Sequence, residues 1–139
     1  MRSALLLGLA AFLGSAAVAP VSASVLARVS NGRQTMQVYV NQKLTYSWPV
    51  STARRGYRTP TGSYSVQRMH TMWHSRTYGM APMPHSLFFY GGYAIHGTGA
   101  IGQLGRPASH GCVRLAPGNA RTLYGLAQRY GGARIVVTN

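Results

Sequence analysis

The sequence contains no aspartate and no glutamate among its 139 residues. Catalysis by a pair of carboxylates, as in glycoside hydrolases and aspartic proteases, is therefore excluded. A Mg²⁺ or Ca²⁺ site built from carboxylates is excluded for the same reason, and a Ser-His-Asp type of triad would lack its acid. Side-chain salt bridges cannot form, so the fold must rest on apolar burial and backbone hydrogen bonds.

Without acids, the 14 lysines and arginines give a formal net charge of +14 at pH 7. This charge predicts attraction to polyanions such as nucleic acid, anionic cell-wall polymer or a membrane surface. The basic residues are dispersed, with Arg54-Arg55 the only adjacent pair, and no basic helix or RNA-binding signature is present. We therefore expect no nucleic-acid partner. A solvated basic surface without a specific partner is the simpler interpretation.

Residues 1–23 have the features of a secretory signal peptide. Arg2 supplies a positive N-terminal end, an apolar run follows over residues 4–19, and small residues precede a cleavage point after Ala23. We expect export to the periplasm or cell wall. The mature chain is then one domain, residues 24–139, whose charge falls to +13 because Arg2 is lost.

Cysteine is also nearly absent, since Cys112 is the only one. No disulfide can form within the chain, although most cysteines in an oxidising compartment are paired. A single thiol in an exported protein is either buried and inert or kept for chemistry.

Alternating apolar and polar residues predict most of the secondary structure. Residues 35–40 and 43–50 are predicted to form two strands joined by a tight turn at Asn41-Gln42. The further strands predicted are residues 63–69, 86–90, 93–95 and 133–138.

One helix is predicted, over residues 118–130. Ala120, Leu123, Tyr124 and Ala127 recur there with helical spacing, and Pro117 marks its start. The fold class is therefore mainly β, with one principal α-helix near the C-terminus.

Two segments rich in turn-forming residues are predicted to be loops, residues 51–62 and residues 70–85. The second carries aromatic and methionine side chains that we expect to pack over a cleft. His70 and His74 have the i, i+4 spacing of metal ligands on a helix. Without acidic ligands or a second cysteine we expect no metal and no cofactor.

The segment 94–115 carries the most chemistry. His96 follows a short apolar strand, and Cys112 comes 16 residues later, after a glycine-rich loop long enough to fold back. A histidine beside a cysteine can generate the reactive thiolate. His110 lies only two residues before Cys112, and an inert buried cysteine is the alternative.

The neighbours of Cys112 complete a possible site for acyl transfer. Gly111 and Cys112 could offer backbone N–H groups to a developing oxyanion. Arg114 could hold a substrate carboxylate with a forked pair of hydrogen bonds. Because the chain has no acid, a backbone carbonyl or a neutral side chain must orient the catalytic histidine.

These residues resemble the signature of the L,D-transpeptidases with a YkuD-type catalytic domain. The resemblance rests on His96-Gly97 and, at the family's distance, on the string SHGCVR over residues 109–114. Weaker likeness, including TPTG at residues 59–62, extends it over about residues 35–138.

The resemblance implies a β-sandwich-like or barrel-like fold with the cysteine on a rim. It implies ping-pong acyl transfer on peptidoglycan tetrapeptide stems, with Cys112 as the nucleophile, His96 as the base and the Gly97 carbonyl orienting the ring. Oxyanion and substrate contacts would come from Ser109, His110, Gly111 and Arg114. D-Ala would be released, and cross-links or wall-attached proteins, including outer-membrane proteins, would be the products. Carbapenems typically acylate the cysteine of such enzymes.

Three alternatives remain open at this stage. The same acyl-enzyme resolved by water would make the protein an L,D-carboxypeptidase. A basic, non-enzymatic binder of wall polymer or nucleic acid would not need Cys112. A zinc protein would use His70, His74, His110 and Cys112 as ligands.

Overall fold

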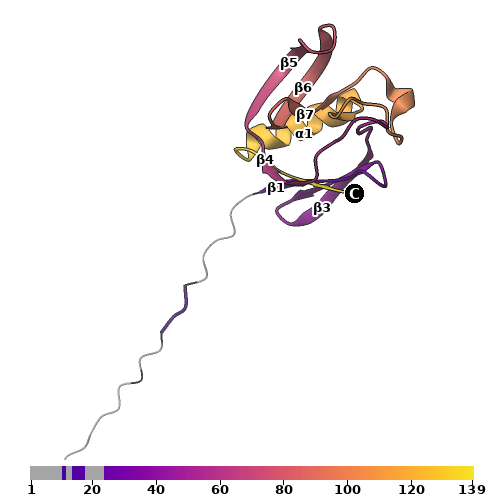
Figure 1. Ribbon diagram of the computed structural model, residues 1–139. Coiled ribbons are helices and arrows are strands. Elements are labelled where there is room, and N and C mark those ends of the chain that lie inside the picture. Colours follow the sequence, from indigo (N-terminus) through magenta and orange to yellow (C-terminus); the bar gives the residue numbers. More distant parts are fainter. Residues whose placement is uncertain (1–10, 12–13, 18–23) are drawn as a thin grey trace, which may run out of the picture.

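The computed structural model describes residues 11, 14–17 and 24–139 (Figure 1). The predicted signal peptide, residues 1–23, falls largely outside this described part. Within it, no helix is long and apolar enough to cross a membrane.

Two sheets make up the domain. The first, sheet A, has the strand order β3-β2-β1-β9-β4 and the second, sheet B, has the order β5-β6-β7-β8. The strands of sheet A are β1 (Val25–Ser30), β2 (Thr35–Val40), β3 (Lys43–Pro49), β4 (Gly62–Ser65) and β9 (Arg134–Thr138). Those of sheet B are β5 (Arg68–Ser75), β6 (Ala81–Tyr90), β7 (Tyr93–Gly97) and β8 (Val113–Leu115). The one α-helix, α1 (Pro117–Arg129), and a short 3₁₀ turn, η1 (Ile101–Gln103), complete the described elements.

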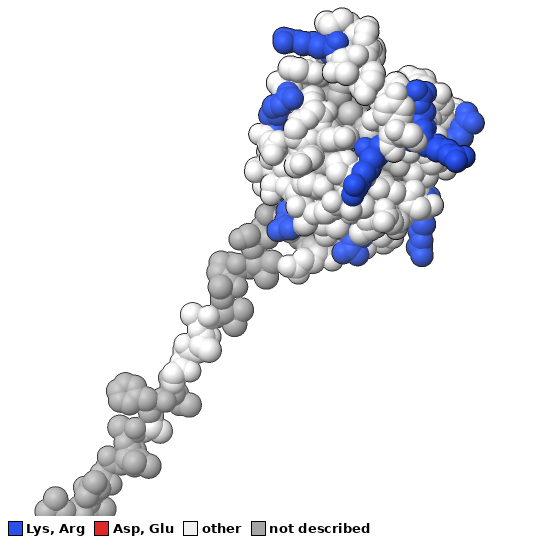
Figure 2. All heavy atoms as spheres, viewed as in Figure 1, with Lys and Arg blue, Asp and Glu red and all other residues white. Residues whose placement is uncertain are grey.

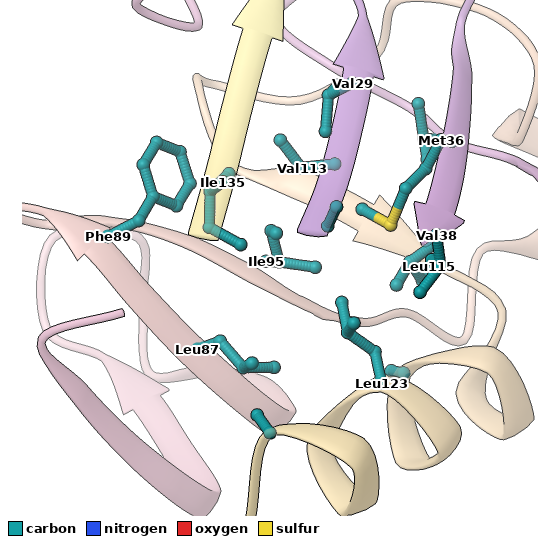
Figure 3. Packing of buried hydrophobic residues seen from close by; sticks show 14 of the residues in the cluster. Val29, Met36, Val38, Leu87, Phe89, Ile95, Val113, Leu115, Leu123 and Ile135 are labelled. Carbon is teal, nitrogen blue, oxygen red and sulfur yellow. The ribbon is translucent and has the colours of Figure 1, made fainter. Parts of the chain in front are cut away.

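The hydrophobic core lies between sheet A, sheet B and α1. Figure 3 shows side chains from all three pointing into it, among them Val29, Met36, Val38, Leu87, Ile95, Leu115 and Leu123. These residues are fully buried. The helix contributes Ala120, Leu123, Tyr124 and Ala127, the face predicted from the sequence. The expected class, mainly β with one helix near the C-terminus, is confirmed.

The predicted β2–β3 hairpin is also confirmed. The strands pair antiparallel from Thr35 with Pro49 to Val40 with Lys43. Asn41 and Gln42 both have positive φ, 49° and 68°, as the favoured two-residue hairpin turn requires. Two strands lie in segments for which no strand or loop was predicted. They are β1, whose Val25, Ala27 and Val29 alternate into the core, and β8, whose Val113 and Leu115 do the same.

The prediction of a long loop over residues 70–85 is wrong. Strands β5 and β6 form an antiparallel hairpin with its turn at residues 76–80, and Figure 1 shows it projecting away from sheet A. Pro82 and Pro84 suggested a loop because proline donates no ladder hydrogen bond. The two prolines are two residues apart, so both lack an N–H group on the same side of β6. Strand β6 pairs with β7 only from Leu87 onward. That side of β6 therefore has no neighbouring strand at the two prolines.

The single strand predicted over residues 63–69 is likewise wrong. The strand structure is interrupted at Val66-Gln67, where the chain passes from β4 in sheet A to β5 in sheet B. Both halves have strand periodicity, so the pattern did not reveal the change of sheet.

Candidate active site

Sheet B has a second, outward face that carries the residues singled out in the sequence. Strands β7 and β8 run parallel, with His96 in register with Arg114. Cys112 directly precedes β8, on the same face as Arg114 by strand alternation. His96, Cys112 and Arg114 line one cavity of about 630 Å³, together with Ser109 and His110. The fold therefore brings together residues that are 16 positions apart.

His96 is buried, with 7% of its surface exposed. Its Nδ1 lies 2.7 Å from the backbone oxygen of Gly97. A carbonyl only accepts hydrogen bonds, so Nδ1 carries the proton and Nε2 keeps its lone pair. Burial lowers the pKa of His96 to about 4, against the opposing effect of the Gly97 carbonyl, and Arg114 lowers it further. The ring is therefore neutral near pH 7 and able to accept a proton.

The thiol of Cys112 is half-buried and unpaired. Burial raises its pKa, against the lowering effects of the Ala94 backbone N–H and of Arg114. The sulfur lies 3.9 Å from the carbonyl oxygen of Gly92. The resting site thus combines a neutral thiol with a neutral imidazole.

The turn before Cys112 is held by buried polar contacts. Ser109 Oγ donates to the Cys112 carbonyl (2.6 Å) and accepts from the Gly111 N–H (3.0 Å). Thr59 Oγ1 donates to the Gly111 carbonyl (2.8 Å) and accepts from the Ala53 N–H (3.0 Å). Gly111 has φ = 141°. The Gly111 N–H, expected at the oxyanion, is therefore already engaged by Ser109.

Sequence reasoning missed a residue behind this turn, Gln34. It is buried, and its amide donates to Thr52 Oγ1 (2.6 Å) and accepts from the Thr52 N–H (2.9 Å). The Thr52 carbonyl in turn accepts from the N–H of Ser109 (2.9 Å). A continuous hydrogen-bonded path thus runs from the β1–β2 turn to the cysteine turn. A glutamine between strands carries no local signal of such a role.

Arg114 is held in the site by hydrogen bonds of both its backbone and its side chain. Its backbone pairs with Ser51 in both directions, at 2.9 and 3.0 Å, and its Nη1 donates to Gln103 Oε1 (3.1 Å). An arginine with no acidic partner keeps its remaining donors for a ligand.

His110 lies in a different environment from His96. Its ring stacks on Tyr78 at 4.2 Å between centroids and meets Tyr57 edge-on at 4.7 Å. Tyr78 belongs to the β5–β6 turn, so the hairpin contacts the cysteine turn through this stack. Burial, with Arg54 and Arg114, lowers the pKa of His110. The expectation that aromatic and methionine side chains of residues 70–85 cover a cleft is correct, since Trp73, Tyr78 and Met83 line the cavity.

Charge and metal ligands complete the description. Figure 2 shows lysine and arginine side chains scattered over the visible face, with no acidic residue among them. His70 and His74 lie on strand β5, not on a helix. The described residues contain no group of three side chains placed to hold a metal ion.

Comparison with known proteins agrees with this geometry. Residues 24–137 match the YkuD family, the L,D-transpeptidase catalytic domain. No match was found among curated protein sequences. An L,D-transpeptidase from Mycobacterium smegmatis superposes with a TM-score of 0.75 at 25% identity, over 84% of this chain and 59% of that one. The corresponding values for an L,D-transpeptidase from Stackebrandtia nassauensis are 0.74, 25%, 84% and 56%.

A third solved structure is a complex with an adduct. It is L,D-transpeptidase 3 from Mycobacterium tuberculosis in complex with a faropenem-derived adduct, with a TM-score of 0.71 at 19% identity, over 84% of this chain and 61% of that one. This chain therefore spans about three fifths of the length of these solved proteins. Because the family match covers nearly all of residues 24–139, the chain belongs to the YkuD family of L,D-transpeptidase catalytic domains.

Proposed function

We propose that the protein is an exported cysteine L,D-transpeptidase that acts on peptidoglycan tetrapeptide stems. The family acts on the cell wall, which implies peptidoglycan stems as substrates and a place outside the cytoplasm. The observation that carries the proposal is the bond from His96 Nδ1 to the Gly97 carbonyl. This bond keeps the proton on Nδ1, so that Nε2 can act as the base that a protein without carboxylates needs. His96 lies in the cavity that also holds Cys112.

In the first half-reaction Cys112 attacks the carbonyl that joins the L-centre of the diamino acid to the terminal D-Ala. His96 Nε2 takes the thiol proton as the sulfur–carbon bond forms, because both groups are neutral at rest. The negative charge on the carbonyl oxygen is stabilised by the Cys112 N–H. Arg114 holds the terminal carboxylate of the D-Ala with a forked pair of hydrogen bonds. The bond to nitrogen then breaks, and His96 returns the proton to the departing amine of D-Ala.

In the second half-reaction an amine of an acceptor stem attacks the thioester. His96 accepts the amine proton and gives it back to the sulfur when the thioester breaks. The product is a new amide cross-link and free Cys112. An amine on a wall-attached protein would give attachment, and water would give hydrolysis, by the same two steps. Acceptor choice depends on which group the cavity holds against the thioester.

The deciding experiment incubates residues 24–139 with a tetrapeptide-stem muropeptide and follows products by mass spectrometry. Dimer plus D-Ala supports transfer, and D-Ala alone supports hydrolysis. Cys112→Ala is expected to abolish both. Full activity of Cys112→Ala would reject the mechanism.

Faropenem provides a probe that does not depend on the acceptor. We expect the wild type to gain a stable mass adduct on Cys112, whereas Cys112→Ser gains none. An adduct on both proteins would place the reaction away from Cys112.

The excess positive charge supports a further part of the proposal, which is attraction to anionic wall polymer. Co-sedimentation with purified sacculi is expected to fall as salt rises. Binding that salt does not change would reject the electrostatic explanation. Export is tested separately by the N-terminal sequence of the protein outside the cytoplasm, which is expected to begin at Ser24.

A further inference from the structure

Arg68 lines the same cavity as Cys112, although it lies on the opposite edge strand of sheet B. It is the first residue of β5 and its side chain is exposed. Nothing in the transfer mechanism above uses it.

The strand register places Arg68 and Cys112 on one row across the sheet. Arg68 pairs with Phe88, and Phe88 pairs with Ala94. Cys112 lies one residue before Val113, which pairs with Ile95, so it stands beside Ala94. Three strand spacings separate the two ends of the row, about 14 Å between backbones.

The guanidinium group extends along this row toward the thiol. Its central carbon lies 3.6 Å from the centroid of the Phe88 ring, so the charge sits one strand closer to Cys112, roughly 10 Å away. Phe88, Met83 and Ala94 form a small apolar cluster on this face, against which Cys112 and Trp73 pack. Arg68 and Cys112 thus lie at two ends of one apolar floor.

The orientation of the guanidinium is fixed by three contacts. Besides Phe88, the ring of Trp73 lies 4.8 Å from its central carbon, and Nη1 donates to His70 Nε2 at 3.1 Å. Stacking against aromatic faces leaves the edge of the guanidinium, with its N–H donors, open to a planar ligand.

No side chain of this protein can supply an anion for that edge, because the sequence has no aspartate or glutamate. Three other arginines lie over tyrosine rings at 5.0 to 5.8 Å, namely Arg28, Arg54 and Arg129. Arg68 differs from them in contacting two rings, one of them closely, inside the cavity of the proposed active site. A planar, bidentate donor set is the arrangement that recognises carboxylates.

We propose that Arg68 binds a carboxylate of the donor peptide, upstream of the terminal D-Ala and roughly 10 Å from the carbonyl that Cys112 attacks. This inference rests on the proposed function, whose substrate it specifies. Arg114 would hold the end of the peptide near the thiol, and Arg68 would select peptides with a free carboxylate at the far end of the cleft.

The test compares two tetrapeptide stems, one with free upstream carboxylates and one with those carboxylates amidated. The D-Ala release rate is measured for wild type, Arg68→Gln, Arg68→Lys and Arg129→Gln. We expect Arg68→Gln to lower kcat/KM for the free-acid peptide roughly 10- to 100-fold, the usual effect of losing a charged hydrogen bond. The amidated peptide should change less than about two-fold, since Arg68 then has no anion to bind.

The control variants separate charge from geometry. Arg129→Gln removes one positive charge from a residue that does not line the cavity, and it should leave both peptides unaffected. Arg68→Lys keeps the charge but loses the planar fork, so we expect an intermediate loss. An equal loss on both peptides would assign Arg68 a structural role, and no loss on either would make it a surface residue; both results overturn the proposal.

Equilibrium binding to Cys112→Ser separates this inference from the proposed function. If the wild type releases no D-Ala, yet Cys112→Ser prefers the free-acid peptide and Arg68→Gln removes that preference, the reaction is wrong and the Arg68 site stands. If D-Ala is released and no preference exists, the reaction stands and the Arg68 site is wrong. If no D-Ala is released and neither peptide binds to Cys112→Ser, both are rejected.

Discussion

The chain contains the dipeptide His-Gly at 96–97 and again at 110–111, and the fold treats the two copies differently. His96 is buried on strand β7 with its Nδ1 against the Gly97 carbonyl. His110 lies in a turn between two tyrosine rings, and no described backbone carbonyl orients it. Two identical dipeptides thus supply the proposed base in one case and part of the cavity wall in the other. A carbonyl partner and burial therefore single out His96 as the proposed base, although His110 is closer to the cysteine in sequence.

The largest expected effect separates the two histidines. His96→Gln should lower kcat/KM for D-Ala release roughly 10²- to 10⁴-fold, because glutamine cannot accept the thiol proton. His110→Gln should lower it less than about ten-fold, since it removes only ring packing. Comparable losses in the two variants would contradict the different roles proposed for His96 and His110. Circular dichroism of both proteins serves as the control for folding.

The pH dependence of stability comes next in size. The pKa of His96 is about 4 in the folded protein and 6.5 in the unfolded chain, so the unfolded state binds more protons between these values. The contribution of His96 to the free energy of unfolding is therefore fully present above pH 6.5. It falls by about 3 kcal/mol as the pH approaches 4. Side-chain carboxylates, the usual source of acid unfolding, are absent.

Urea unfolding of wild type and variants at pH 7 and pH 4 measures this loss. His96→Gln should remove most of the dependence, whereas His110→Gln should keep it. A wild type equally stable at both pH values would show that His96 is not buried as a neutral ring.

The glycines of the two His-Gly dipeptides, Gly97 and Gly111, also differ in the space around them. Gly111 has φ = 141°, and a Cβ there would lie 2.6 Å from Tyr93 Cε1 and 3.0 Å from the Arg58 carbonyl oxygen. Gly111→Ala should therefore cost about 2–3 kcal/mol and displace the cysteine turn. At Gly97 the nearest atom would be Pro84 Cγ at 3.2 Å, so Gly97→Ala should cost only about 1 kcal/mol. Urea midpoints decide the order, and the reverse order would contradict the assignment.

The smallest effect concerns the support of the cysteine turn. Thr59→Val keeps the volume but leaves the Gly111 carbonyl and the Ala53 N–H without their partner, so we expect a loss of about 1–2 kcal/mol in stability. The matched control is Thr45→Val, whose hydroxyl bonds to the Lys43 carbonyl on the exposed strand β3; it should change stability by less than about 0.5 kcal/mol. Thr59→Val should also lower the rate of faropenem adduct formation, and an unchanged rate would mean that the turn needs no such support.

Much of this molecule could be read from local patterns. Alternation identified the β2–β3 hairpin, and helical spacing identified the buried face of α1, because both periods follow directly from backbone geometry. The β5–β6 hairpin was mistaken for a loop because Pro82 and Pro84 are unfavourable in a paired strand unless one side is open. Which side is open depends on where β7 lies, and that is not a local property.

The amino-acid composition limits the chemistry available to this protein to one thiol, few histidines and no side-chain carboxylate, so a neutral group has to orient any histidine base. Which histidine can be that base depends on the fold, because only packing of β7 beside β8 buries His96 in the cavity with Cys112. The fold also brings Gln34 and Thr59 to support the cysteine turn and places Arg68 over the ring of Phe88 on the neighbouring strand. Those contacts join residues far apart in the chain, and local periodicity carries no information about them.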